Sequence, residues 1–136
     1  MSQSTGTPSN ADALTAAFAA ADEGDAGLLV GLYADDMTWA GFTLDGTQRV
    51  YTKGEFLAAF GILAKLDEAR NEVVRTDETD EGIVVAWIRA YRRLGEDVLD
   101  FTMVMTHQFV DGKVVRGTDI CPPSFAEYWT RTGLNA

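Results

Sequence analysis

The sequence is poor in the side chains that bind metals or form cross-links. Its 136 residues include one cysteine, Cys121, and one histidine, His107. A lone cysteine excludes a disulfide within the chain and fits a reducing compartment. One cysteine and one histidine also fall short of the ligand clusters that hold zinc, and no glycine-rich phosphate-binding loop is present. The sequence therefore predicts a cytoplasmic protein with no metal and no cofactor.

Basic residues are also scarce. The chain has 11 Lys and Arg against 21 Asp and Glu, which gives a net charge of −10. Such acidity repels the phosphates of nucleic acids and the surfaces of anionic membranes. Long hydrophobic runs are missing as well: no stretch reaches the length of a membrane span, and the Ser/Thr-rich start lacks the apolar core of a signal peptide. We expect a small molecule as the partner, with no nucleic acid and no membrane.

Hydrophobic residues make up 46% of the chain, and their spacing predicts helices mainly in the first half. Residues 1–9 are polar and predicted to be disordered, whereas residues 10–136 have the length of one domain. Four helices are expected: one over residues 10–22 capped by Ser9 or Asn10, a short one between Asp25 and Asp35-Asp36, one opened by the capping-box pair Thr52 and Glu55, and a terminal one over 125–131.

Alternating apolar residues predict strands in the second half. Five are expected, over residues 38–42, 69–77, 83–94, 98–110 and 113–121. Helices followed by a long meander predict an α+β fold, with a curved antiparallel sheet wrapped around the N-terminal helices. Both faces of the 83–94 strand are apolar, since Val84 and Ala86 alternate with Val85 and Trp87. One face can cover the helices, and the other predicts a homodimer packed through the open sheet face.

The last two strands flank Asp111-Gly112, which is a strong hairpin signal. The first arm places His107 on the same face as Met103, because side chains alternate along a strand. The register of the second arm stays open at this point. A two-residue turn puts Thr118 on the His107 face, whereas a three-residue turn with a bulge at the glycine puts Asp119 there, opposite Met103.

Several short motifs together resemble one known superfamily. They are LYADDMTW after the second helix, the T-x-x-E helix start, and the closing strand DGKVVRGTDI. From about residue 10 to Trp129 the chain resembles the SnoaL-like, or nuclear transport factor 2-like, superfamily. The resemblance implies a cone-shaped α+β barrel with a deep apolar pocket, commonly dimeric. Members include ketosteroid isomerases, polyketide cyclases, limonene epoxide hydrolases, dehydratases and non-catalytic binders, so the site must decide the function.

The resemblance to the steroid isomerases fails at the catalytic positions. Gly41 stands where their base lies, and Ala17 or Phe18 stands where their oxyanion-hole tyrosine lies. Thr106 or His107 occupies the place of their protonated aspartate. Without a base and oxyanion donors, that enolisation mechanism is excluded. The dehydratases of this superfamily need a histidine early in the chain, where this sequence has none.

Asp119 matches the acid/base aspartate that the related polyketide cyclases carry on their last strand. The resemblance thus favours the register that turns Asp119 toward the pocket, where apolar neighbours would raise its pKa. The alternative is a solvent-exposed aspartate at a strand end. Epoxide hydrolases add an Arg-x-Asp on an earlier strand, where this chain has Arg89-Ala90-Tyr91 and so lacks the second carboxylate.

Two further polar residues are candidates for the site. Arg89 shares a row with Asp119 if residues 95–97 form a three-residue loop, and it would then orient the carboxylate or bind a substrate oxygen. An interface salt bridge is the alternative. His107 would lie roughly 13 Å from the row of Asp119, at about 3.4 Å per residue, so it contacts another part of the ligand or packs in the core. Arg92-Arg93 is interpreted as a solvated strand end.

The expected pocket walls are aromatic and thioether side chains, although core packing explains the aromatic ones equally well. They are Phe18, Tyr33, Trp39, Tyr91, Met103 and Met105. The first hypothesis is an enzyme that cyclises or isomerises a polyketide-like or other oxygenated hydrophobic molecule by acid/base chemistry, with Asp119, Arg89 and His107 as its catalytic residues. The alternatives are a non-catalytic protein that binds a hydrophobic ligand or a partner, and an epoxide hydrolase-like enzyme.

Overall fold

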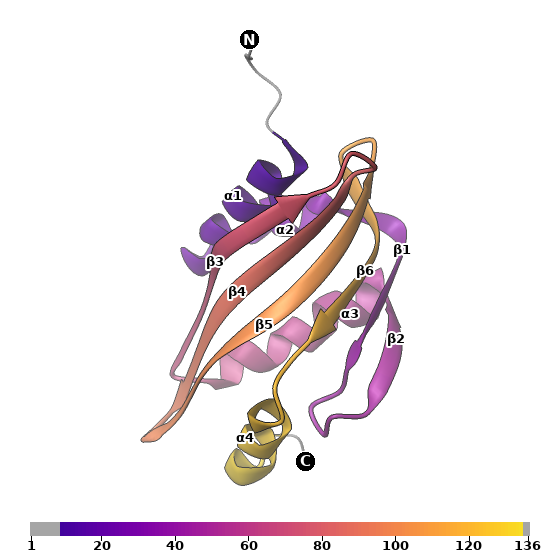
Figure 1. Ribbon diagram of the computed structural model, residues 1–136. Coiled ribbons are helices and arrows are strands. Elements are labelled where there is room, and N and C mark those ends of the chain that lie inside the picture. Colours follow the sequence, from indigo (N-terminus) through magenta and orange to yellow (C-terminus); the bar gives the residue numbers. More distant parts are fainter. Residues whose placement is uncertain (1–8, 135–136) are drawn as a thin grey trace.

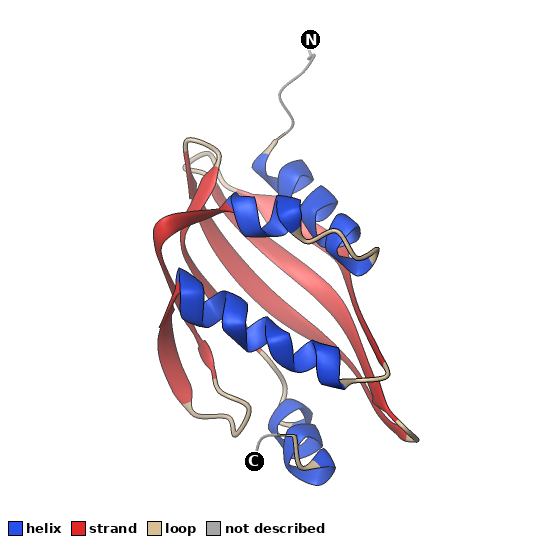
Figure 2. Ribbon diagram, turned by 180° about the vertical axis from the view of Figure 1, so that it is seen from behind, coloured by secondary structure: helices blue, strands red, loops and turns tan. Residues whose placement is uncertain are grey.

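A curved six-stranded sheet forms the body of the protein, and helices cover one of its faces (Figures 1 and 2). The structure, a computed structural model, describes residues 9–134. Its helices are α1 (Asn10–Asp22), α2 (Gly27–Leu32), α3 (Lys53–Ala59), the 3₁₀ helix η1 (Phe60–Lys65) and α4 (Ser124–Thr132). Its strands are β1 (Tyr33–Phe42), β2 (Gln48–Thr52), β3 (Glu68–Glu78), β4 (Ile83–Leu94), β5 (Asp97–Val110) and β6 (Lys113–Ile120). The predicted α+β class is confirmed.

The strand order is β2-β1-β6-β5-β4-β3, which places the last strand in the middle of the sheet. Tight hairpins join β3 to β6 as an antiparallel meander, whereas β6 runs parallel to β1. A parallel pair needs a long crossover, and here the whole segment from β2 to β5 supplies it. The sheet is therefore mixed, which corrects the expected all-antiparallel sheet. It curves around the helices and stays open between its edge strands β2 and β3 (Figure 1).

The helices begin where the sequence predicts. The Ser9 side chain accepts a hydrogen bond from the backbone N–H of Asp12 and caps α1, and Thr52 and Glu55 form the complete capping box of α3. The core lies between the helices and the inner face of the sheet. Its fully buried residues include three from α1 (Leu14, Ala17, Phe18) and alternate positions of β4 (Val84, Ala86, Ile88, Ala90).

The region between α2 and α3 differs most from expectation. β1 begins at Tyr33, because Tyr33 already pairs with Val114 of β6, so Asp35-Asp36 lie inside a strand and do not end a helix. β2 was not expected at all. Its sequence, QRVYT, has little alternation, and its pairing with β1 is what holds it extended. The predicted disordered segment, residues 1–9, lies outside the described residues except for Ser9.

The β5–β6 hairpin combines features of both predicted registers. Asp111 and Gly112 have φ angles of 50° and 79°, and they form a two-residue turn that pairs Val110 with Lys113. The register then shifts between Gln108 and Phe109, because β6 contains one extra residue there. This bulge brings Asp119 to the face that carries His107, as the resemblance favoured. Asp119 lies opposite Met105, however, and not opposite Met103 as expected.

Within residues 9–134, no helix covers the other face of the sheet (Figure 1). One row of neighbours on this outer face runs from Arg75 through Trp87 and Val104 to Ile120, and the Arg75 guanidinium lies over the Trp87 ring at 4.5 Å. Ile120 is 65% exposed. This is the surface through which the homodimer was predicted, and the dimer stays a prediction. No helix within residues 9–134 is long and apolar enough to cross a membrane.

Candidate active site

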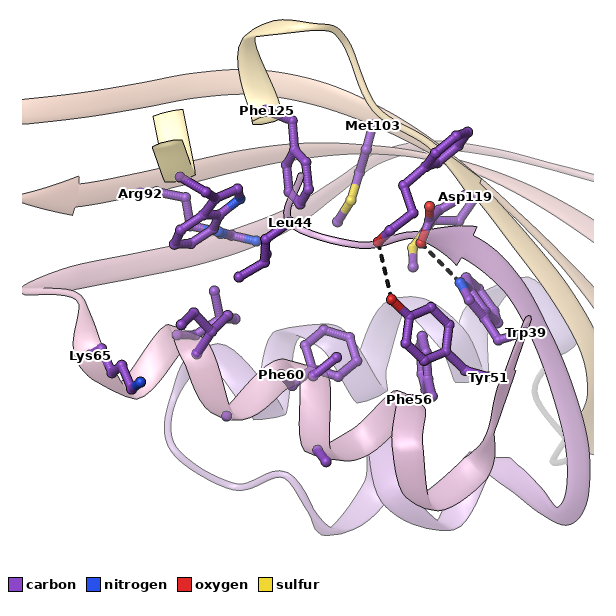
Figure 3. Close-up of a pocket in the computed structure, with 18 residues that line it drawn as sticks. Trp39, Leu44, Tyr51, Phe56, Phe60, Lys65, Arg92, Met103, Asp119 and Phe125 are labelled. Carbon is purple, nitrogen blue, oxygen red and sulfur yellow. Dashed lines mark hydrogen bonds between the residues drawn. The ribbon is translucent and has the colours of Figure 1, made fainter. Parts of the chain in front are cut away.

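A cavity of about 440 Å³ lies between the inner face of the sheet and the helices. This size suits a drug-sized organic molecule. Its floor comes from α3 and η1, its roof from β4, β5 and β6, and its ends from the β1–β2 hairpin and α4 (Figure 3). The lining residues are mostly apolar: Trp39, Phe42, Leu44, Tyr51, Phe56, Ala58, Ala59, Phe60, Gly61, Ile62, Leu63, Lys65, Arg92, Met103, Met105, Asp119, Phe125 and Trp129.

Asp119 is the one carboxylate among these lining residues. The Trp39 Nε1–H donates a hydrogen bond to its Oδ2 at 2.9 Å (Figure 3). Burial among apolar side chains raises the pKa of Asp119, and the Trp39 hydrogen bond opposes this rise to a lesser degree. A carboxyl group with a raised pKa exchanges protons more readily near neutral pH than an ordinary aspartate does. Asp119 is therefore suited to acid/base chemistry.

Two glycines make room for this pair. A Cβ atom on Gly117 would lie 2.1 Å from Trp39 Cζ3, so the indole ring lies directly on the glycine backbone. A Cβ atom on Gly41 would lie 3.0 Å from Asp119 Oδ2 and 3.2 Å from Trp39 Cδ1. The rings of Phe56 and His107 hold the indole from its other sides, with centroids 4.5 and 5.2 Å away. The orientation of Trp39, and with it that of Asp119, is fixed by packing.

Tyr51 of β2 brings a hydroxyl group to the same end of the cavity (Figure 3). This hydroxyl donates to the backbone carbonyl of Phe42 at 3.3 Å, a long hydrogen bond. Burial raises the pKa of Tyr51, the Arg49 guanidinium above its ring lowers it, and the charge of Asp119 raises it further. A weakly held, neutral O–H beside the carboxyl group can reorient toward an oxygen atom of a ligand.

The opposite end of the cavity is cationic. Arg92 lies there, with Lys65 at the rim (Figure 3). Arg92 is only 4% exposed, and burial lowers its pKa to about 10, so it is charged at neutral pH. Its interpretation as a solvated strand end was wrong, because β4 turns alternate residues inward and Arg92 follows Ala90 on the buried face. The cavity thus has an acid at one end and a cation at the other.

No family model matches the chain, and no curated protein matches its sequence. Solved structures do match its fold. Bal32a, from a soil-derived mobile gene cassette, aligns with a TM-score of 0.75 and 21% identity over 88% of this chain and 95% of its own. IdmH, a proposed polyketide cyclase from Streptomyces antibioticus, aligns with a TM-score of 0.72 and 17% identity over 91% and 98%. A nuclear transport factor 2-like protein of unknown function from Burkholderia pseudomallei aligns with 0.72 and 16% over 91% and 97%.

The chain has the SnoaL-like, or nuclear transport factor 2-like, fold. Its cavity occupies the space between the helices and the sheet of that fold. Four of the nine site residues predicted from the sequence line it. Asp119, Trp39, Met103 and Met105 all face the cavity. Residues of α3 and η1 line its floor, and this was not predicted because their spacing is equally typical of core packing.

His107 and Tyr33 lie behind the cavity wall of the SnoaL-like fold and do not line it. Both are at most 1% exposed, and the His107 ring contacts those of Trp39 and Tyr33. His107 pairs with Gly117 and so lies one row from Asp119, much closer than expected. Burial lowers its pKa to about 4. Neither ring nitrogen has a hydrogen-bond partner of good geometry among residues 9–134, although the backbone of Val84 is close enough to favour the charged form slightly.

The expected positions of Arg89 and Tyr91 were wrong. The loop after β4 has two residues, because Leu94 pairs with Asp97, so Arg89 pairs with Thr102 and points to the outer face. There its guanidinium forms a two-pronged ion pair with Asp100 at 2.9 and 3.1 Å. Tyr91 shares this face, whereas Phe18 is 1% exposed in the core and is not among the residues that line the cavity. An epoxide hydrolase-like site would need Arg89 and a second carboxylate. Neither is among the residues that line the cavity.

Proposed function

We propose that the protein is an enzyme that moves a proton within an oxygenated hydrophobic substrate, using Asp119 as acid and base. The observation that carries the proposal is the buried carboxyl group of Asp119 at one end of an apolar cavity, with a raised pKa and a single fixed donor. The fold it shares with IdmH, a proposed polyketide cyclase, adds support at the level of the fold.

The reaction begins when the Asp119 carboxylate takes a proton from a carbon next to a carbonyl group. The electron pair of the broken C–H bond moves into an enolate, whose negative charge collects on the carbonyl oxygen. In a ring closure, the enolate carbon then forms a C–C bond to a second carbonyl carbon, whose π electrons move to its oxygen. Asp119 returns the proton to that oxygen, so the product is an isomer of the substrate and no cofactor is consumed.

The remaining polar groups at this end of the cavity have supporting roles. The Tyr51 hydroxyl leaves its long hydrogen bond to Phe42 and donates to the enolate oxygen. The Trp39 Nε1–H holds one carboxylate oxygen, which leaves the other oxygen of Asp119 to accept the proton. The apolar walls fold the substrate so that its two reacting carbons lie close together, which turns ring closure into a unimolecular step.

Deuterium exchange tests the proton transfer without knowledge of the natural substrate. The probe is 1-tetralone, a bicyclic aryl ketone, and NMR follows the replacement of its α-protons in D₂O. We expect the wild-type protein to accelerate exchange and Asp119→Asn to lose this acceleration by about 100-fold. Asp111→Asn is the matched control, because it removes the same charge from the exposed turn of the same hairpin. Equal exchange by the wild type and Asp119→Asn would refute the proposal.

Stability measurements show whether loss of exchange reflects unfolding. Since burial raises the pKa of Asp119, its protonated carboxyl group contributes to stability below the unfolded pKa, and the contribution is lost as the pH rises through the folded pKa. Asp119→Asn is therefore expected to be no less stable than the wild type at neutral pH. If both proteins bind 1-tetralone and neither accelerates exchange, the non-catalytic ligand-binding alternative is supported.

A further inference from the structure

Two N–H donors at the cationic end of the cavity have no acceptor. Arg92 Nε and Trp129 Nε1 are both buried and without a hydrogen-bond partner within residues 9–134. Both residues line the cavity. A series of contacts joins them, because the Arg92 guanidinium lies over the Phe101 ring at 5.8 Å, and the Phe125 ring touches those of Phe101 and Trp129. Buried donors are nearly always paired in native proteins, so this pair requires an explanation.

The rest of the Arg92 side chain is firmly held. Nη1 donates to the backbone carbonyls of Arg70 and Tyr91 at 3.0 Å, and Nη2 donates to Asn71 Oδ1 at 2.8 Å. These acceptors fix the plane of the guanidinium group, but all three are neutral. They orient the positive charge without neutralising it.

No carboxylate among the described residues forms an ion pair with Arg92. Among the carboxylates, Asp22 acts on the charge of Arg92 without pairing with it: it accepts the backbone N–H of Asn71, and the Asn71 side chain contacts Arg92. Burying a charge without a counter-ion is costly, and proteins rarely retain such an arrangement where it has no use. Arg92 is thus a buried, oriented cation that faces an apolar cavity.

We propose that Arg92 and Trp129 bind a carboxylate of the ligand, so that the cavity takes hydrophobic acids. This rests on the proposed function, because the ligand is the substrate of Asp119, and it defines the class of that substrate. The Arg92 Nε–H and the Trp129 Nε1–H, both unpaired within residues 9–134, then turn toward the cavity and donate to the carboxylate. The positive charge of the guanidinium group then gains its counter-ion.

The two ends of the cavity determine how such an acid lies. Arg92 pairs with Leu99 and Asp119 with Met105, six residues apart on β5, which corresponds to about 20 Å along the strand. A ligand carboxylate at Arg92 consequently lies far from the Asp119 carboxylate, which would repel it. The reacting ketone is directed to Asp119 and Tyr51, and the protein, with its net charge of −10, attracts the acid only through this one end.

Two probes of the same shape test the preference for an acid. Anthracene-2-carboxylate and anthracene-2-carboxamide differ in the charge of one substituent, and fluorescence titration gives the affinity of each. We expect the wild type to bind the carboxylate at least about tenfold more tightly than the amide. Arg92→Met should abolish this ratio and leave amide binding nearly unchanged. Arg89→Gln is the matched control, since it removes a positive charge from the same strand on the outer face.

Further measurements cover a failure of Arg92→Met to fold. Trp129→Phe keeps an aromatic ring but removes one donor, and it should reduce the ratio by about threefold. In the wild type, the side-chain Nε–H resonance of Arg92 should shift on addition of the carboxylate and not of the amide. Equal affinities of the wild type for both probes, a ratio retained in Arg92→Met, or an unmoved Nε–H resonance would each overturn the proposal.

The outcome for Asp119→Asn separates the two proposals. This variant should keep the preference for the carboxylate, because Asp119 lies at the other end of the cavity. If Asp119→Asn still exchanges the protons of 1-tetralone while the carboxylate preference depends on Arg92, the proposed catalytic role fails and the anion site stands. If exchange depends on Asp119 and the two anthracene probes bind equally, the anion site fails and the catalytic role stands.

Discussion

Replacement of Gly117 by alanine tests whether packing fixes the pair of Trp39 and Asp119. The new Cβ atom would lie 2.1 Å from Trp39 Cζ3 and 2.7 Å from the backbone carbonyl oxygen of Thr106. To reach the ordinary carbon–carbon separation of about 3.5 Å, the indole ring would have to move by about 1.4 Å. Trp39 is 1% exposed and packs against the rings of Tyr33 and Phe56, so the indole can yield only by displacing these rings or by moving into the cavity.

The expected cost follows from these contacts. Overpacking of a tight core site costs about 3 kcal/mol, and loss of the Trp39 hydrogen bond to a charged Asp119 costs about 1.5 kcal/mol more. The sum, about 4.5 kcal/mol, corresponds to a fall in melting temperature of about 15 °C for a domain of this length. A displaced Trp39 also no longer stabilises the carboxylate, so the pKa of Asp119 should rise further.

Urea denaturation followed by circular dichroism measures the stability, and carbon-detected NMR titration measures the Asp119 pKa. Gly54→Ala is the control, because that glycine lies exposed in α3 and a Cβ atom there meets nothing within 4 Å. It should stabilise the protein slightly, since alanine favours a helix. A Gly117→Ala variant within about 1 kcal/mol of the wild type, with an unchanged Asp119 pKa, would refute the view that the glycine surface positions the indole.

Three other predictions address separate parts of the molecule. His107→Phe should leave stability at pH 7 unchanged or raised. The wild type should lose about 3 kcal/mol of stability as the pH falls from about 6.5 to about 4, because the folded pKa of His107 lies below the unfolded one, and the variant should not show this loss. Urea denaturation across that pH range measures the difference. Trp39→Phe keeps a ring but removes the donor to Asp119, so the acid limb of the pH–rate profile should move to higher pH; an unmoved limb contradicts the role given to the indole N–H. Val104→Lys puts a charge between Trp87 and Ile120 on the outer face of the sheet. Sedimentation velocity should then show a dimer for the wild type and a monomer for the variant. A monomeric wild type refutes the predicted homodimer.

Features that depend on near neighbours in the sequence were predicted well. The helix over 10–22, the strand over 83–94 and the Thr52–Glu55 capping box agree with the structure because each follows from local spacing and local hydrogen bonds. β2 depends instead on its pairing with β1, and the parallel pairing of β1 with β6 depends on residues far along the chain. No local pattern carries that information.

The candidate site shows how a single residue in a loop decides the face of a strand. Arg89 and Arg92 differ by an odd number of positions and so point to opposite faces of β4. A two-residue loop after Leu94 turns Arg92 inward, and the expected three-residue loop favoured Arg89. Asp119 was assigned to the correct face because the resemblance favoured that face. The bulge that turns Asp119 to this face was expected at Gly112, but it lies opposite Gln108 and Phe109.

The central position of β6 also governs the order in which the protein can fold. Trp39 and Asp119 are 80 residues apart in the sequence, and their hydrogen bond forms only when the last strand enters between β1 and β5. The meander from β3 to β5 can form early from local contacts, whereas the β1–β2 hairpin can join the sheet only after β6 has formed. During synthesis, β5 therefore exposes an unpaired edge until β6 emerges, and this interval is when the chain is most prone to pair with other chains.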